Sequence, residues 1–299
     1  MTDPAGPLRA PQCLGRRSLL LGGGAALVLP RQAAARRGAS TLGLADTTVR
    51  KELARDYAGT LRAVAAMGYG RFGFRLASYV ANDPSEPTAQ DKARMVRDAG
   101  MTVGVVRLGV RGADYDRQFD QAAAIGANIV ALTTAPIFIA SRTLGQTTRA
   151  ALDAYIPQLA ALGEKAKAAG LTLAYHNHWY DLMPIDGDRP LDLMASRIAP
   201  DLLSFEIDLA WAWYAGVAPL DLLAALGPRV VSMHLKDIDR NHGTAITDHA
   251  VTPGSGEMGY AALMPRIARL TRVTGYVEVD NPEDGLAAAR AAMAYLRGR

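Results

Sequence analysis

The stretch from residue 153 to residue 178, DAYIPQLAALGEKAKAAGLTLAYHNH, contains the unit that decides the fold. A segment rich in alanine and leucine, typical of a helix, ends at Gly170, and a short apolar run follows at once. Glycine just after a helical segment indicates the C-terminus of the helix, and a short apolar run indicates a buried strand. The stretch therefore predicts a helix that leads directly into a strand.

The same unit recurs along the chain, with Gly68, Gly100 and Gly126 standing before similar apolar runs. A doubly wound sheet is the alternative, but it would carry a glycine-rich phosphate turn after the first strand, and TLGLADTTVRK has none. Eight such units in about 260 residues, without a linker-like break, predict a (β/α)8 TIM barrel of the α/β class. We expect its strands over residues 41–46, 71–77, 102–108, 128–134, 171–178, 202–211, 230–237 and 275–280.

The first 40 residues differ from the rest of the chain. They contribute a charge of +5 to a chain whose net charge is +4, which leaves −1 for the remainder. The pair Arg16-Arg17, the short apolar segment 18–30 and the Ala33-Ala34-Ala35 triplet are typical of a cleaved export signal, and the segment resembles a twin-arginine signal. Because a bilayer span takes about 20 residues, the segment is too short for a stable membrane anchor.

From this composition we expect residues 1–40 to be an export signal and linker, residues 41–299 to be a single catalytic domain, and the mature protein to be periplasmic. A near-neutral body has no electrostatic footprint for nucleic acid. Cys13 is the only cysteine, so an internal disulfide is excluded. The sequence leaves room for a homo-oligomer.

Ionisable residues stand in pairs at the ends of the last four predicted strands. Each pair has the i, i+2 spacing that places both side chains on one face of a strand, and barrel enzymes collect their catalytic groups at the C-terminal strand ends. Burying so many ionisable groups is costly unless they pair or bind a cation, and imidazole with carboxylate is a ligand set for a divalent ion. The pairs are His176 and His178, Glu206 and Asp208, His234 and Lys236, and Glu278 and Asp280.

Five motifs in order carry a resemblance to a known family: HNHWYDL, FEIDLAWAWYAGVAPLDLL, RVVSMHLKDID, PGSGEMGY and YVEVDNPEDGLAAARAAMAYL. Together with the looser match LARDYAGTLRAVAAMGYG, they resemble the sugar phosphate isomerase/epimerase family, which has the xylose isomerase-like TIM barrel. The resemblance implies one divalent metal ion, with manganese first and magnesium, cobalt or zinc as alternatives. It implies four ligands, His176, Asp208, His234 and Glu278, with His178 or Glu206 as replacements for His176.

The expected chemistry is enolisation of a carbohydrate carbonyl compound by an isomerase or epimerase. A divalent ion polarises the carbonyl, and a nearby base removes the adjacent proton. Glu278 and His178 are the candidates for base and acid, and Lys236 offers a cation for the developing oxyanion. We expect the small-molecule carbohydrate to contact His178, Asp181, Trp211, Lys236 and Asp280, with Trp179 and Trp213 as further aromatic candidates.

Three further interpretations compete with this one. A lyase or dehydratase would begin with the same proton removal and then eliminate from a 3-keto-glycoside or an inosose. A non-catalytic periplasmic sugar-binding protein would show aromatic and amide side chains without a metal ligand set. An apurinic endonuclease would need a richer zinc ligand set and a basic face, and a body of charge −1 with three strand-end histidines argues against it.

Several residues could belong to either the mouth or the surface. Arg75 and Arg107 lie on the second and third predicted strands. The polar loop 238–258 is suited to an active-site lid, and we expect His242 and His249 within it to be solvated.

Overall fold

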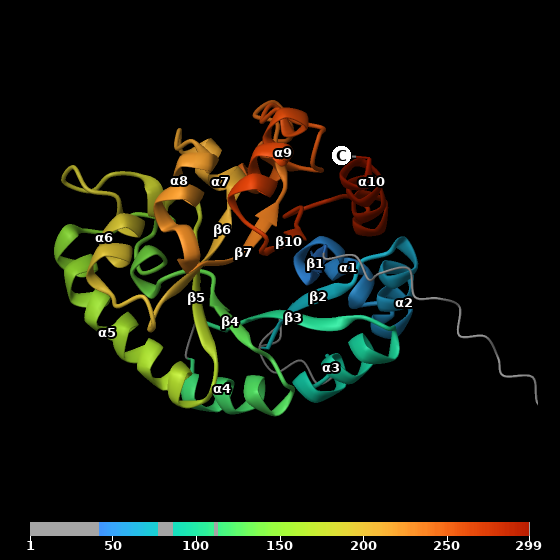
Figure 1. Ribbon diagram of the computed structural model, residues 1–299, viewed down its shortest axis with the longest axis horizontal. Helices are drawn as coiled ribbons and strands as arrows, with labels where there is room; N and C mark the ends of the chain where they lie inside the picture. The colour runs from blue at the N-terminus through green and yellow to red at the C-terminus, as the bar shows by residue number, and fades with distance from the viewer. Residues whose placement is uncertain (1–41, 77–85, 111–112, 299) are drawn as a thin grey trace, which may run out of the picture. The chain divides into compact units, whose positions relative to one another are not determined.

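The computed structural model describes residues 42–76, 86–110 and 113–298. Eight parallel strands form a closed barrel in the order β1-β10-β7-β6-β5-β4-β3-β2 (Figure 1). The predicted (β/α)8 TIM barrel and its eight strands are confirmed. The strands are β1 (Gly43–Ala45), β2 (Arg71–Arg75), β3 (Thr102–Arg107), β4 (Ile129–Leu132), β5 (Thr172–His176), β6 (Ser204–Asp208), β7 (Val230–Leu235) and β10 (Thr274–Val277).

Helices connect the strands and surround the barrel (Figure 1). The α-helices are α1 (Arg50–Leu53), α2 (Tyr57–Met67), α3 (Ala89–Asp98), α4 (Tyr115–Ala124), α5 (Arg149–Ala168), α6 (Pro190–Arg197), α7 (Leu209–Tyr214), α8 (Pro219–Leu226), α9 (Tyr260–Leu270) and α10 (Gly285–Arg297). The 3-10 helices are η1 (Asp46–Val49), η2 (Pro136–Phe138), η3 (Trp179–Leu182), η4 (Gly227–Arg229) and η5 (Ile246–His249).

Local sequence signals explain where the helices begin and end. The Thr148 hydroxyl accepts a hydrogen bond from Ala151 N at the start of α5, at 3.1 Å. Two residues beyond α5, Gly170 has a φ of +74°, a left-handed conformation that only glycine adopts without a steric cost. Gly68, Gly100 and Gly126 also have positive φ and follow the ends of α2, α3 and α4. All four helices therefore end where the sequence predicts.

Tyr276 fills the barrel interior below the mouth. Its ring is 3% exposed and packs with Val105 and Ala131, and its hydroxyl accepts a hydrogen bond from Val105 N at 3.2 Å. A Cβ atom on Gly43 or on Gly104 would lie 2.3 Å or 2.6 Å from an atom of this side chain. The two glycines on β1 and β3 therefore leave the space that the tyrosine on β10 occupies.

The segment predicted to be a lid is partly ordered as a hairpin. Strands β8 (Asp237–Ile238) and β9 (Ala250–Val251) pair in an antiparallel sense, and η5 lies between them. Asp237 is fully buried and accepts hydrogen bonds from Gly254 N and Met258 N, each at 3.0 Å. The loop that follows β9 is thus fixed to the end of the barrel by one carboxylate.

Residues 42–298 fall within one compact unit. The export signal and linker expected over residues 1–40 lie outside the described residues. Among the residues that the structure describes, no helix is long and apolar enough to cross a bilayer.

We predict that Gly104→Ala destabilises the protein by about 1–3 kcal/mol, because overpacking forces neighbouring atoms to shift. The added methyl group would lie 2.6 Å from the Tyr276 hydroxyl oxygen. Urea unfolding measures the change. Gly298→Ala is the matched control, because its Cβ would have no neighbour closer than 3.6 Å. Equal stability of the two variants would contradict this account of the barrel interior.

Candidate metal centre

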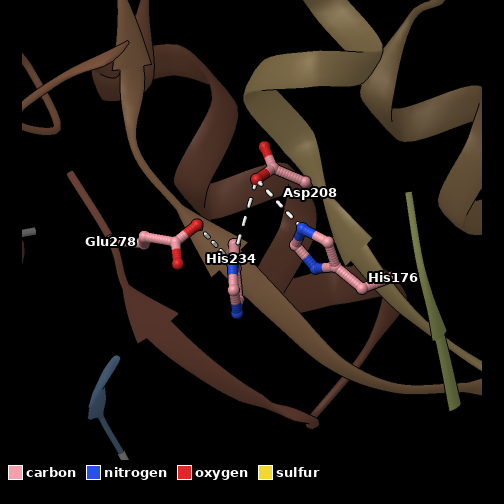
Figure 2. Close-up of side chains that lie close together, drawn as sticks. All are labelled: His176, Asp208, His234 and Glu278. Carbon is pink, nitrogen blue, oxygen red and sulfur yellow. Dashed lines mark hydrogen bonds and ion pairs between the residues drawn. The ribbon is translucent and has the colours of Figure 1, made fainter. Parts of the chain in front are cut away.

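Four side chains from four adjacent barrel strands meet at the mouth (Figure 2). One ligand atom from each of them lies within 4.8 Å of the others, and all four residues are buried. They are His176 at the end of β5, Asp208 at the end of β6, His234 on β7 and Glu278 just after β10. The structure therefore brings together the four residues that the sequence resemblance implies as ligands.

Asp208 faces both histidines of this group. Its Oδ2 atom is 3.8 Å from His176 Nε2 and 3.8 Å from His234 Nδ1, and the two imidazole rings are 4.4 Å apart (Figure 2). Glu278 Oε2 lies 2.8 Å from the same His234 nitrogen. Two imidazole nitrogens and two carboxylate oxygens thus face one small volume.

The backbone fixes the orientation of Asp208. Its Oδ1 atom accepts hydrogen bonds from Ala210 N and Trp211 N, each at 3.0 Å, and so caps the start of α7. Asn177 bonds to both the N–H and the C=O of Asp208. Oδ2 is left facing the two histidines without an aligned hydrogen bond, although Lys236 Nζ lies 2.9 Å from it.

Negative charge is in excess around the four residues. Lys236 is completely buried, and its Nζ atom lies 2.8 Å from Glu278 Oε2 and 2.7 Å from Asp280 Oδ2. Arg107 pairs with Asp46 and lies 3.5 Å from Glu278 Oε1. Four carboxylates contact these two cations, and a fifth, Glu206, contacts the two histidines; the four are Asp46, Asp208, Glu278 and Asp280.

This excess appears in the pKa values of the two histidines. Burial alone would lower the pKa of His234, but Glu278 and Glu206 outweigh it and raise that pKa to about 10. Burial and the neighbouring His234 lower the pKa of His176. The carboxylates therefore attract one positive charge into the cluster, and a second imidazolium beside the first is disfavoured.

The donor set fits a divalent metal ion. Neutral imidazole and carboxylate are the ligands of zinc, manganese and related ions, and such sites keep open positions for water or substrate. A buried carboxylate oxygen without an aligned hydrogen bond is costly unless a cation compensates it. Among the described residues, this cluster could hold a metal ion, and its residues leave the identity of the ion open.

The comparison with known families agrees with this geometry. The family model described as xylose isomerase-like TIM barrel matches residues 61–299. The chain belongs to the xylose isomerase-like TIM barrel family. None of the curated protein sequences matches it.

Several solved structures share the fold of this chain at low sequence identity. A sugar phosphate isomerase/epimerase from Parabacteroides distasonis is 18% identical, with a TM-score of 0.72 over 90% of this chain and 98% of that one. The IolI protein, solved with a zinc atom, is 12% identical, with a TM-score of 0.66 over 86% and 96%. A probable 3-DHS dehydratase, AsbF from Bacillus anthracis, is 14% identical, with a TM-score of 0.62 over 86% and 99%.

His178 lies beside the cluster of this xylose isomerase-like barrel. Its ring is 5.0 Å from that of His176 and stacks on Tyr180 at 5.3 Å, and its buried Nδ1 has no hydrogen-bond partner. Burial, His176 and Lys236 together lower the pKa of His178 well below its usual value. The ring is therefore a neutral group that is placed to exchange a hydrogen bond.

Asp181 occupies an enclosed position, in contrast to the substrate contact that the sequence suggests. It is fully buried, and its oxygens accept hydrogen bonds from the Tyr175 hydroxyl and from His178 N, each at 2.7 Å. Both carboxylate oxygens of Asp181 therefore already accept hydrogen bonds from the protein itself. This geometry gives Asp181 the task of holding the HNHWYDL turn in place.

Trp211 is also more enclosed than a sugar-binding surface would be. It is 1% exposed, and its ring lies 5.1 Å from Trp179, 5.7 Å from Tyr214 and 5.0 Å from Lys236 Nζ. Trp179 and Tyr214 are only partly buried. Trp211 therefore forms the rear of an aromatic wall whose more open members are its two neighbours.

The remaining candidates divide between mouth and surface. Arg107 reaches the cluster, whereas the expected lid histidine His242 is exposed and pairs with Asp248 O at 2.7 Å. His249 is only half-exposed and packs against Tyr214 at 5.9 Å. Asp46 is a mouth residue that was not predicted, although it ends the first predicted strand, where the strand-end rule applied to the later strands would have found it.

We predict that Asp181→Asn changes the pH dependence of stability. Burial raises the pKa of Asp181 to about 7, whereas a carboxyl group in an unfolded chain has a pKa of about 3.9. The folded protein therefore holds this proton more tightly, and the stability gained is full below about pH 4 and lost as the pH rises through 7. From pH 5 to pH 8, wild type should lose about 2.5 kcal/mol relative to the variant.

Urea unfolding of both proteins at the two pH values measures this difference. Tyr175→Phe is the control, because it keeps the carboxyl group; it should still lose stability as the pH rises, over a range moved to higher pH, since the hydrogen bond that it removes lowers the pKa of Asp181. Parallel slopes for wild type and Asp181→Asn would show that this carboxyl does not titrate as described.

Proposed function

We propose that the protein is a metal-dependent enzyme that enolises a carbohydrate carbonyl compound, as a sugar isomerase or epimerase. The observation that carries the proposal is the cluster of His176, Asp208, His234 and Glu278 at the C-terminal mouth of the barrel. Barrel enzymes place their chemistry at this mouth. The sugar phosphate isomerase/epimerase and the zinc-containing IolI protein that share its fold support the assignment.

We propose one divalent ion per chain, with manganese first and magnesium, cobalt or zinc as alternatives. Such an ion polarises a carbonyl and stabilises the charge that develops on its oxygen after proton loss. The four residues of the cluster would hold the ion, and Lys236 would present an ammonium group beside it. His178, a neutral imidazole at the same place, would exchange a hydrogen bond with a substrate hydroxyl.

The base that removes the proton would be a carboxylate of the mouth. Glu278 is the candidate from the sequence, but its Oε2 pairs with His234 and Lys236 and its Oε1 faces Arg107. Asp280 pairs with Lys236 through Oδ2, and its side chain is 17% exposed against 6% for Glu278. The geometry therefore favours Asp280 for proton removal and Glu278 for metal binding.

We propose an uncharged carbohydrate as the substrate. Both cations of the cluster are already paired, Lys236 with three carboxylates and Arg107 with two. A phosphate group would have to compete with these carboxylates for the same cations. The partly buried rings of Trp179 and Tyr214 offer apolar faces on which a sugar ring can pack.

A lyase or dehydratase is the second candidate, and the dehydratase that shares the fold favours it. The first step would be the same proton removal, and the enolate would then expel a leaving group from the neighbouring carbon. The candidate substrates are 3-keto-glycosides and inososes. A non-catalytic sugar-binding protein would have no use for four converging metal ligands, and the cluster weighs against it.

We predict that the enzyme exchanges the α-hydrogen of a 3-keto-glycoside or a ketose with solvent deuterium. Asp280→Asn should slow this exchange by a factor of 10² or more, on the order of what a general base contributes, while the metal content stays at the wild-type level. Glu278→Gln should lose both exchange and metal. NMR of the recovered carbohydrate and elemental analysis of each variant give the two readings.

Asp221→Asn on the outer helix α8 is the control and should behave like wild type. Turnover without deuterium incorporation or a primary isotope effect at the α-carbon would rule out enolisation. The isomerase and lyase assignments would then both be wrong, because both begin with this proton removal. If Asp280→Asn exchanges deuterium at the wild-type rate, Asp280 is not the base and Glu278 remains the candidate.

We also propose that the protein is exported to the periplasm through a twin-arginine signal. The support is Arg16-Arg17, the apolar segment after it and the Ala33-Ala34-Ala35 triplet. Replacing both arginines by lysine should leave the protein in the cytoplasm with its full N-terminus. Fractionation and N-terminal sequencing measure this. Unchanged export of the double variant would contradict the route, and an intact N-terminus on the exported form would contradict cleavage.

A further inference from the structure

Glu206 lies between the two histidines of the metal centre, on the side away from Asp208. Its side chain is completely buried, and its Oε1 atom is 3.3 Å from His176 Nδ1 and 3.2 Å from His234 Nε2. Its other oxygen, Oε2, accepts a hydrogen bond from the Ser232 hydroxyl at 2.7 Å. One carboxylate oxygen therefore contacts both imidazole rings at once.

The two contacts involve different nitrogens of the two rings. His176 presents Nδ1 to Glu206 and Nε2 to Asp208, whereas His234 presents Nε2 to Glu206 and Nδ1 to Asp208. Each ring thus has one nitrogen on the side of the ligand carboxylates and one on the side of Glu206. A neutral imidazole carries one N–H and one lone pair, so the side that receives the N–H decides which nitrogen can bind a metal.

An ionised carboxylate can only accept hydrogen bonds, and each of its oxygens has two lone pairs. Glu206 Oε1 is buried and has no aligned hydrogen bond, and the same holds for His176 Nδ1, so the contacts are close but not yet linear. A small rotation of the rings would align them. Burying this carboxylate is costly unless hydrogen-bond donors face it, and among the described residues the side chains within polar contact of it are the two imidazoles and Ser232.

We infer that Glu206 is a positioning residue that holds the two histidines in opposite tautomers, with the proton on Nδ1 of His176 and on Nε2 of His234. The lone pairs of His176 Nε2 and His234 Nδ1 then face Asp208 and Glu278, where a metal ion would bind. This inference rests on the proposed metal centre. It removes Glu206 from the candidate ligands and gives it a single task that serves two ligands.

The partners of Glu206 on the adjacent strands support this assignment. Glu206 is opposite His176 on β5 and opposite Ser232 on β7, so its two hydrogen-bonding sides are set by adjacent strands. Asp208 follows two residues later and is opposite His234. Both side chains lie on one face of β6 at successive levels, and their contacts with different ring nitrogens place one carboxylate on each side of the imidazole pair. Carboxylates that orient ligand histidines are a general feature of metal sites, and their loss typically lowers metal affinity by 10- to 100-fold.

The direct test is ¹⁵N NMR of the histidine side chains in the full-length protein loaded with zinc, which is diamagnetic. The expected spectrum shows a protonated Nδ1 for one of the two ligand histidines and a protonated Nε2 for the other, assigned with His176→Gln and His234→Gln. The same tautomer in both rings would overturn the inference.

Zinc affinity, measured by competition with a chelating dye, gives a second reading without any substrate. Glu206→Gln keeps the size of the side chain but replaces one acceptor by an N–H₂ donor, and it should lower the affinity by about 10- to 100-fold. Ser232→Ala, which removes the group that holds Oε2, should lower the affinity less. Glu52→Gln is the matched control, because Glu52 accepts from Gly285 N and contacts no histidine.

The outcomes separate this inference from the proposed function. If wild type binds zinc and Glu206→Gln binds it equally well, the positioning role is wrong and the metal centre stands. If wild type binds no zinc, the metal centre itself is wrong, and the role of Glu206 falls with it. If Glu206→Gln does not fold, the wild-type tautomers and the Ser232→Ala affinity still decide the matter.

Discussion

The burial of ionised groups at the mouth of the barrel is the constraint on which the site depends. Lys236 is completely buried against Asp208, Glu278 and Asp280, and Arg107 is buried between Asp46 and Glu278. Taking charges out of water is costly, and the cost is offset only when each charge has partners of opposite sign. The carboxylates outnumber the two cations, so a further positive charge would stabilise the site. His176 and His234 lie where a metal ion would supply that charge. The same excess explains why one of these histidines has a raised pKa.

The barrel supplies the geometry that this chemistry needs. Its strands end at one mouth, and neighbouring strands hold Asp208 opposite His234 and Glu206 opposite His176. Below the mouth the ring of Tyr276 closes the interior, so the polar groups rest on a packed floor. Around them, α7 donates two backbone N–H groups to Asp208, and Asn177 bonds to its backbone. The four candidate ligands are thus held by the fold itself.

Much of this arrangement could be predicted from the sequence, because it depends on repeating signals. Glycines at the helix ends and short apolar runs located all eight strands, and the i, i+2 pairs located the groups at the mouth. The direction in which each side chain points and the extent of its burial could not be predicted. The spacing placed Glu206 and Asp208 on one face, but only the structure shows them on opposite sides of the imidazoles. In the same way, Asp181 is buried and accepts a hydrogen bond from Tyr175, a pairing that the sequence does not indicate.

The central claim is that the four converging side chains form the binding site of one divalent ion. Anomalous X-ray diffraction, from crystals of protein purified without chelators, tests it most directly, because data on both sides of an absorption edge locate and identify a metal. The account predicts one peak per chain between His176, Asp208, His234 and Glu278, at the manganese edge first and otherwise at that of zinc or cobalt. No peak at this position, even after the crystals are soaked in each of these ions, would contradict it.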